Sequence, residues 1–349
     1  MGELTPERET DDPVETHGAL EAPRPDLTSS LHPLPGKSSW PASVEPLPRA
    51  EGSISWRILG IVRTVRPHQW VKNVFVLAPV VFAKEIFEAE LLTRAFSAFA
   101  VFCLLAGAVY TINDIADVSA DRLHPVKRYR PIASGRVPLR VAKFFAGLLV
   151  AVSLGWALVL TPAFFVVAAA YFALNIAYTM KLKHVAYLDV SCIAAGFVLR
   201  VLGGGFAARI EVSWYLFACT ALLALFLGFG KRRHELTTAS ARAGKQRLAL
   251  EGYTRRGLDL ALSVTSVLTL GTYLVYTLDA ETRAFFRTDW LWPSTALGML
   301  GIWRFLYIVR NRPKAESPTQ EMLSDGPFVA IVLGYAALVM WLVYHLQPS

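Results

Sequence analysis

Charged side chains are scarce in this 349-residue sequence. Asp, Glu, Lys and Arg together make up 18% of it, and 54% of the residues are hydrophobic; an ordinary soluble domain is roughly 25% charged. The shortage is also uneven, because long segments carry no charge at all. Folded as a soluble protein, the chain would have too little polar surface to cover its core. The composition predicts a polytopic membrane protein, in which each span needs ~20 mostly apolar residues.

Cysteine is scarce as well, with three residues in the whole chain. Cys103, Cys192 and Cys219 all fall inside apolar runs, without metal-ligand spacing and without an evident pairing. We interpret them as small buried hydrophobic residues. The sequence therefore offers no disulfide framework.

Proline is unevenly distributed: nine of the twenty prolines lie in residues 1–50, among Ser, Glu and Asp. Such a segment buries too little apolar surface to offset the entropy lost on ordering, so it is expected to be a disordered tail. It also lacks the basic start and apolar core of a signal peptide. We therefore predict one membrane domain over residues 57–346.

Apolar runs dominate the rest of the chain and predict an all-α fold, a membrane bundle of nine transmembrane helices. The runs cover residues 69–86, 93–112, 139–160, 162–180, 186–206, 213–230, 258–278, 290–308 and 328–346. Loops after the even-numbered runs contain 18 Lys and Arg, and the loops on the opposite side contain 5. Since cytoplasmic loops are enriched in these residues, the N-terminus is predicted to be cytoplasmic, in a cell (plasma) membrane. The same rule explains most of the net charge of +8 without a nucleic-acid partner.

One loop concentrates acidic residues. The stretch NDIADVSAD at 113–121 follows the second run, and a continuing helix would place Asp114, Asp117 and Asp121 on one stripe with Asn113 beside them. Clustered carboxylates repel each other unless a cation lies among them, and hard oxygen ligands suit Mg²⁺. The alternative is a solvated loop whose acids pair with nearby cations such as Arg122, Lys127 and Arg128.

Cations follow these aspartates at once. Lys127, Arg128 and Arg130 lie within four residues. A metal ion alone leaves a diphosphate with net negative charge, and lysine and arginine next to the metal can neutralise it. The combination indicates phosphate binding.

A second charged group lies in residues 178–205, which begin at Tyr178. Asp189 and Arg200 share one face of the predicted helix, Arg200 roughly 16 Å deeper by helix rise. Charge at that depth marks a functional site or a buried ion pair. The three glycines at 203–205 permit close helix contact.

Two further motifs, RPHQWVKN at 66–73 and GFGKRRHEL at 228–236, lie on the same predicted side. Together with the first two groups they are predicted to line one cytoplasm-facing cavity. The candidate substrate-binding residues of these motifs and of the second group are Lys72, Tyr178, Lys183, Asp189, Arg200, Lys231, Arg232 and Glu235.

These motifs resemble the UbiA superfamily of intramembrane prenyltransferases, through the N-D-x-x-D-x-x-x-D pattern at 113–121 and the predicted topology. The resemblance covers about residues 57–346. Aromatic prenyltransferases of the superfamily carry a second aspartate-rich motif near the end of span six. Here that region contains Lys231, Arg232 and Arg233, with Glu235 as its only acid.

In having cations in place of these carboxylates, the sequence resembles one branch of the superfamily, the decaprenyl-phosphate phosphoribosyltransferases. Their patterns match at 66–73, 124–135, 182–200 and 230–232. The resemblance implies transfer of 5-phosphoribose from phosphoribosyl diphosphate (PRPP) to a polyprenyl phosphate, with Mg²⁺ held by Asp114, Asp117 and Asp121. Donor phosphates would contact Lys72, Lys127, Arg128 and Arg130, while Lys183, Arg200, Lys231 and Arg232 are left undivided between the 5-phosphate and the lipid phosphate.

Two other functions are open from the residues. One is transfer of a polyprenyl group from its diphosphate to an aromatic or other small acceptor. The other is a transporter or lipid-phosphate binder without chemistry, although the charges cluster at the cytoplasmic ends and transporter sites usually lie at the midplane. Self-association of the chain is also left open.

Overall fold

The computed structural model describes residues 53–84, 87–241, 248–311, 321–322 and 324–344. The predicted disordered tail lies outside these residues. Within the described part of the chain every regular element is a helix, which confirms the all-α class. The elements, in chain order, are α1 (Ile54–Thr64), η2 (Pro67–Leu77), α2 (Ala78–Phe82), α3 (Ala89–Ala116), α4 (Val118–Leu123), η3 (Lys127–Tyr129), α5 (Leu139–Leu160), α6 (Pro162–Met180), η4 (Leu182–His184), α7 (Leu188–Ala208), α8 (Trp214–Ala241), α9 (Leu248–Glu251), α10 (Arg255–Leu278), α11 (Ala280–Phe286), α12 (Ser294–Asn311) and α14 (Gly326–Tyr344).

Seven of the described helices are long and apolar enough to cross a membrane, and each corresponds to a predicted run. They are α3, α5, α6, α7, α8, α10 and α14. The boundary between α5 and α6 shows how the sequence sets these ends. Thr161 accepts a hydrogen bond from the Phe164 N–H and caps α6, whose first residue is Pro162.

The other two predicted runs adopt different forms, so the described helices do not reach the expected count of nine. The described part of the run at 69–86 folds mainly as a 3₁₀ helix, η2, followed by the five-residue α2. Pro67 and Pro79 lack the N–H that an uninterrupted α-helix needs. Most of the run at 290–308 lies in the 18-residue α12, in which Arg304 lowers the hydropathy and binds Asp325 through two hydrogen bonds of 3.0 and 2.9 Å.

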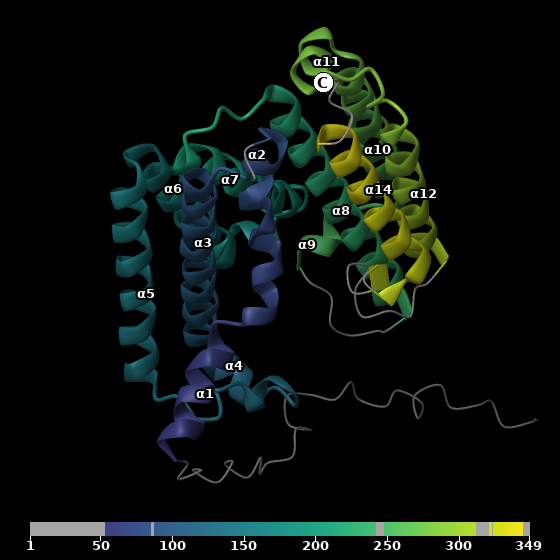
Figure 1. The fold of residues 1–349 in the computed structure, drawn as a ribbon. Coiled ribbons are helices and arrows are strands. Elements are labelled where there is room, and N and C mark those ends of the chain that lie inside the picture. The colour runs from purple at the N-terminus through teal and green to yellow at the C-terminus, as the bar shows by residue number, and fades with distance from the viewer. Residues whose placement is uncertain (1–52, 85–86, 242–247, 312–320, 323, 345–349) are drawn as a thin grey trace, which may run out of the picture. The chain divides into compact units, whose positions relative to one another are not determined.

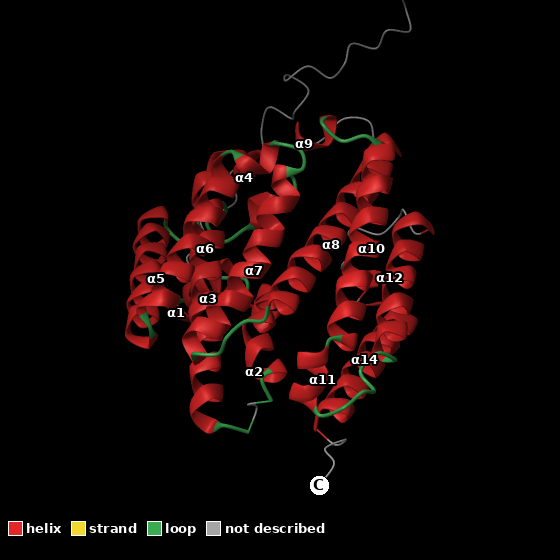
Figure 2. Ribbon diagram, turned by 90° about the horizontal axis from the view of Figure 1, so that it is seen from above, coloured by secondary structure: helices red, strands yellow, loops and turns green. Residues whose placement is uncertain are grey.

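Two groups of helices pack around separate apolar clusters (Figures 1 and 2). In the first, Phe102 of α3 contacts Phe164 and Tyr171 of α6, next to η2 and α7. In the second, Phe226 of α8 contacts Phe305 of α12, next to α10. Helix α7 packs against α8 and joins the groups. This packing brings η2, α3, α7 and α8 together, and these elements carry most of the charged motifs.

Candidate active site

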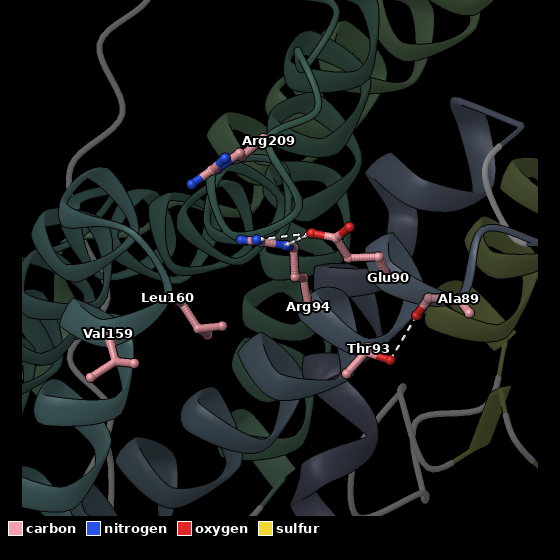
Figure 3. A pocket seen from close by; sticks show the side chains of 7 residues that line it. All are labelled: Ala89, Glu90, Thr93, Arg94, Val159, Leu160 and Arg209. Carbon is pink, nitrogen blue, oxygen red and sulfur yellow. Dashed lines mark hydrogen bonds and ion pairs between the residues drawn. The ribbon is translucent and has the colours of Figure 1, made fainter.

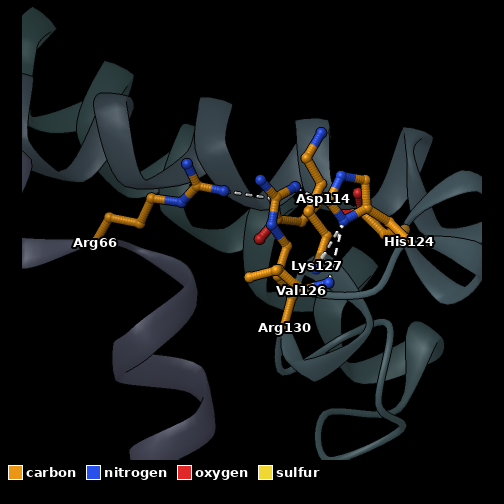
Figure 4. A network of polar contacts seen from close by, with 7 residues as sticks. Arg66, Asp114, His124, Val126, Lys127 and Arg130 are labelled. Carbon is orange, nitrogen blue, oxygen red and sulfur yellow. Dashed lines mark hydrogen bonds and ion pairs between the residues drawn. The ribbon is translucent and has the colours of Figure 1, made fainter. Parts of the chain in front are cut away.

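The acidic stretch lies where α3 ends and α4 begins. Asp114 is 3% exposed and receives two arginines on one oxygen: Arg66 Nη2 lies 2.7 Å and Arg130 Nη1 3.2 Å from its Oδ1. Arg130 Nη1 also lies 2.7 Å from Oδ2 of the buried Asp121. Figure 4 shows Arg66 and Arg130 approaching Asp114 from different segments. The predicted convergence of Asp114 and Asp121 is therefore present, with guanidinium groups as the neutralising cations.

Asp117 behaves differently from its two neighbours. It ends α3 with φ −88° and ψ 2°, and also precedes the first residue of α4. Its carboxylate is half-buried and has no hydrogen bond or ion pair to any described residue. The described residues contain no group of three His, Cys, Asp or Glu side chains arranged to hold one metal. The expected three-carboxylate arrangement is thus not formed, because the helix is interrupted at Asp117 and arginines occupy the other two carboxylates.

The donor set nevertheless fits a hard cation such as Mg²⁺. Asn113 Oδ1 is buried and has no hydrogen-bond partner, which is costly for a polar atom unless a ligand satisfies it. It lies beside Asp114 in sequence, and one helical turn from Asp117, whose backbone N–H donates to the Asn113 carbonyl at 2.9 Å. Oxygen ligands from carboxylates and amides suit Mg²⁺.

The basic run after α4 is only partly joined to these carboxylates. Arg130 contacts them, but Lys127 is exposed. Arg128 donates to the Tyr129 hydroxyl at 2.8 Å and its guanidinium lies 5.0 Å from the centre of that ring. Neither residue pairs with the aspartates. The alternative in which Arg122, Lys127 and Arg128 neutralise these acids is therefore wrong about the partners, which are Arg66 and Arg130.

A second polar network lies deeper, between η2 and α7. Arg200 Nε donates to Asn73 Oδ1 at 2.7 Å, and its other nitrogens donate to the Tyr171 hydroxyl and the Gly196 carbonyl, both at 2.8 Å. Arg200 is 9% exposed. All of these partners are neutral, and no carboxylate of the described residues forms an ion pair with Arg200, so its hydrogen bonds are satisfied while its charge stays uncompensated there.

Lys72 lies beside this network and next to Asn73 in sequence. Its side chain is accessible to solvent, yet the surrounding protein desolvates the amine. This desolvation, together with the positive charges of Lys231 and Arg200, lowers the pKa of Lys72 to about 8. Three cations from η2, α7 and α8 are therefore within electrostatic reach of one another, an arrangement that favours an anion.

Asp189, Arg232 and Glu235 form a third, buried network. Arg232 Nε lies 2.6 Å from Asp189 Oδ2, and Arg232 also pairs with Glu235. The Tyr253 hydroxyl donates to Asp189 Oδ1 at 2.6 Å and accepts from the Tyr187 N–H at 2.7 Å. Burial, and next the bond to Asp189, raises the pKa of Tyr253. The ion pair between Asp189 and Arg232 joins α7 to α8. The two side chains are 0% and 1% exposed, so they are not open to a ligand.

The two remaining predicted residues lie on α6 and η4. Tyr178 near the end of α6 is within electrostatic reach of Arg232. Lys183 is half-buried in η4. Asp189 and Arg200, which share one face of α7, have different partners. The expectation of an interhelical ion pair is right for Asp189, whose partner is Arg232.

A cavity of about 560 Å³ lies at the opposite end of α3. Its lining includes Glu90 and Arg94 at the start of α3, Leu160 at the end of α5 and Arg209 after α7 (Figure 3). A helix of 28 residues separates this end of α3 from the aspartates, about 40 Å at 1.5 Å per residue. None of the predicted site residues lines it.

Arg66 and Tyr253 are not among the predicted site residues, although each contacts one of them. Arg66 carried a signal: it opens the RPHQWVKN motif and precedes Pro67. Its φ of 51° and ψ of 64° place a non-glycine residue in the left-handed region, which is unfavourable and often found at functional sites. Tyr253 carried no comparable signal in the sequence.

These features define a helical membrane protein with a charged site at one end of its spans, and comparison with known proteins assigns it to a family. The model of the UbiA prenyltransferase family matches residues 74–324. The chain therefore belongs to the UbiA prenyltransferase family, and it is an integral membrane enzyme of that group of transferases.

Two relatives and one solved structure agree with this assignment. Decaprenyl-phosphate phosphoribosyltransferase from Mycolicibacterium smegmatis is 43% identical over 201 residues, 56% of this chain and 63% of that protein. The protein of the same name from Mycobacterium tuberculosis is 36% identical over 288 residues, 81% of this chain and 93% of that protein. A UbiA homolog from Archaeoglobus fulgidus, solved bound to DMAPP and Mg²⁺, shares the fold, with a TM-score of 0.57 at 18% identity over 82% of this chain and all of that one. The predicted resemblance is confirmed.

Proposed function

We propose that the enzyme transfers 5-phosphoribose from PRPP to a polyprenyl phosphate such as decaprenyl phosphate, in a magnesium-dependent reaction at the cytoplasmic face of the cell membrane. The relatives from M. smegmatis and M. tuberculosis are named for transfer to this lipid. The excess of Lys and Arg in the loops on the aspartates' side supports the orientation.

The observation that carries the proposal is the uncompensated charge of Arg200. A buried cation whose hydrogen-bond partners are all neutral is costly, and an anionic ligand would offset that cost. Lys72 and Lys231 add further positive charge nearby. Arg200 and Asp114 share no hydrogen-bond partner among the described residues, which supports one position for a metal-bound diphosphate and another for a metal-free phosphate.

The alternative donor and acceptor fit this charge distribution less well. A polyprenyl diphosphate and a neutral aromatic ring bring a single anionic group, whereas PRPP and a lipid phosphate together bring three. In the region where aromatic prenyltransferases of the superfamily place a second carboxylate motif, Glu235 is bound to Arg232, and Asp189 binds the same arginine. The extra anions of the phosphoribosyl reaction would be matched by the extra cations of this chain.

In the proposed reaction a phosphate oxygen of the lipid attacks C1 of the ribose, and the bond from C1 to the diphosphate breaks. The diphosphate departs with the bonding electrons, and no proton has to be removed because the acceptor phosphate is already ionised. Mg²⁺ bound by Asp114, Asp117, Asp121 and Asn113 would supply charge that stabilises the departing diphosphate. Lys72, Arg200 and Lys231 would orient a second phosphate, and the Asp189–Arg232 pair would keep α8 in place beside α7.

The direct test is incubation of the detergent-purified protein with radiolabelled PRPP, MgCl₂ and decaprenyl phosphate, followed by extraction of lipid. Label in the lipid fraction is expected, with none when either the acceptor or the metal is omitted. A lipid fraction without label under all conditions contradicts the proposal. If geranyl diphosphate inhibits the enzyme and PRPP does not, the alternative with a prenyl diphosphate donor is favoured. Arg209→Gln, in the distant cavity, serves as the control variant and is expected to retain activity.

A further inference from the structure

We propose that Arg66 is a ligand for the donor's diphosphate, and that its ion pair with Asp114 keeps it in place until the substrate binds. When a metal ion binds Asp114, the Arg66 guanidinium leaves the carboxylate and binds phosphate oxygens. The inference rests on the proposed function only in requiring a substrate with a metal-bound diphosphate.

Competition for one oxygen atom is the first step of the argument. Arg66 Nη2 and Arg130 Nη1 both contact Asp114 Oδ1, at 2.7 and 3.2 Å. A divalent ion bound to this carboxylate would take up its lone pairs and repel both guanidinium groups. Two arginines and a metal ion on one buried carboxylate would gather four positive charges against one negative charge. At least one arginine must therefore move when the metal binds.

The contacts indicate that Arg66 is the one that moves. Arg130 bridges two carboxylates, Asp114 and Asp121, so losing one of them leaves it paired. Arg66 has Asp114 as its only ion-pair partner among the described residues. Its guanidinium is otherwise held by the face of the Tyr110 ring, 5.0 Å from the ring centre. The ring face attracts the guanidinium cation, so the side chain could turn away from Asp114 and still keep this cation–π contact.

The backbone at Arg66 is consistent with a functional role. Arg66 occupies the left-handed region at the junction of α1 and η2, just before Pro67. A left-handed conformation is disfavoured for arginine and persists where the surroundings require it. Here it directs the side chain towards Asp114, 48 residues further along the chain. The side chain is 28% exposed, so an incoming phosphate can reach it. The planar guanidinium then offers paired donors that match phosphate oxygens.

The two parts of this inference predict opposite effects of one substitution. In Arg66→Gln the competitor for Asp114 is removed, so metal binding in the absence of donor should tighten, by about fivefold on the scale of one partly exposed ion pair. The same variant lacks a phosphate ligand, so diphosphate binding should weaken by about 10- to 100-fold, the scale of a charge-assisted hydrogen bond. A residue that merely supports the fold would weaken both.

The experiment uses the full-length protein in detergent. Mn²⁺, as a spectroscopic substitute for Mg²⁺, is titrated by electron paramagnetic resonance, first alone and then with inorganic diphosphate. Arg63→Gln is the matched control, because Arg63 is exposed on α1 and has no ion pair among the described residues; both affinities should stay unchanged. Arg66→Lys keeps the charge and loses the planar fork, so it should bind Mn²⁺ as the wild type does and diphosphate several-fold more weakly.

Unchanged or weaker Mn²⁺ binding by Arg66→Gln overturns the inference, and so does unchanged diphosphate binding. If Arg66→Gln does not fold, wild-type diphosphate affinity in Arg66→Lys overturns it instead. These titrations contain neither PRPP nor lipid. Failure of phosphoribosyl transfer alongside the expected titrations would therefore refute the proposed substrates and leave the role of Arg66 intact.

Discussion

Gly204 of α7 lies directly against the backbone of Val76 in η2. A Cβ atom built on Gly204 would be 1.8 Å from the Val76 carbonyl oxygen and 2.8 Å from its carbonyl carbon. No side chain fits there, so this glycine sets how closely η2 approaches α7. The close contact that the three glycines at 203–205 predict is therefore present, and its partner is the irregular segment that carries Lys72 and Asn73.

Gly204→Ala is expected to move η2 away from α7 and to separate Asn73 from Arg200. The overlap is with backbone, which cannot rotate aside, so we expect a loss of about 1–3 kcal/mol in the free energy of unfolding, together with reduced transfer activity. Thermal unfolding in detergent and lipid-extraction assays measure the two effects. Gly155→Ala in α5 is the control, since its Cβ would meet nothing within 4 Å. Equal stability of the two variants would show that η2 tolerates displacement.

Asp189→Asn should be among the more destabilising single changes in the chain. It leaves Arg232 buried with Glu235 as its one remaining carboxylate partner among the described residues, and it weakens the bond from Tyr253. Removing one partner of a buried ion pair costs about 3–5 kcal/mol. The midpoint of thermal unfolding should fall clearly. Asp259→Asn, which breaks the more exposed Arg233–Asp259 pair, should lower it much less. Similar midpoints for both variants would contradict the structural role of the buried network.

Segments with continuous apolar character could be predicted from the sequence with good boundaries. The runs at 139–160 and 162–180 coincide with α5 and α6. The run at 69–86 was expected to be a spanning helix and instead begins as η2, because hydropathy records composition and does not show how proline and close packing shape the backbone. Seven of the described helices qualify as candidate spans, and the predicted count of nine is not confirmed.

Partner choice at the site could not be predicted in the same way. The sequence indicated that Asp114 and Asp121 need a cation, but Arg66 is 48 residues away from Asp114 and reaches it only through the packing of η2 against α3. Likewise, the sequence indicated that Asp189 could form a buried ion pair but did not identify its partner. The contact of α7 with α8 selects Arg232. Local periodicity gives the face of a helix, while tertiary packing decides which charge lies opposite it.

Donor binding should weaken in alkaline solution because of Lys72. Its pKa is lowered from 10.5 to about 8, so its positive charge is lost as the pH rises through about 8. A neutral amine no longer attracts phosphate, and the KM for PRPP should rise between pH 7 and 9.5. Lys72→Arg is the informative variant, since arginine stays protonated throughout. The variant should show a flatter pH profile in steady-state assays. Parallel profiles for wild type and variant would assign the pH dependence to another group.

Asp117→Asn tests whether the one unpaired carboxylate of the acidic stretch contributes to metal binding. Asp114 and Asp121 are already neutralised by arginines, whereas the Asp117 carboxylate has no partner among the described residues. The substitution keeps the size of the side chain and removes the charge, so we expect activity to fall by at least ~100-fold, the scale seen when supporting ligands of a metal are lost. Folding should survive, because removing one of several clustered like charges relieves repulsion. Turnover across a Mg²⁺ titration, measured alongside thermal stability, checks both expectations. Near-normal turnover at low Mg²⁺ would mean that this carboxylate is only a solvated group at the end of α3.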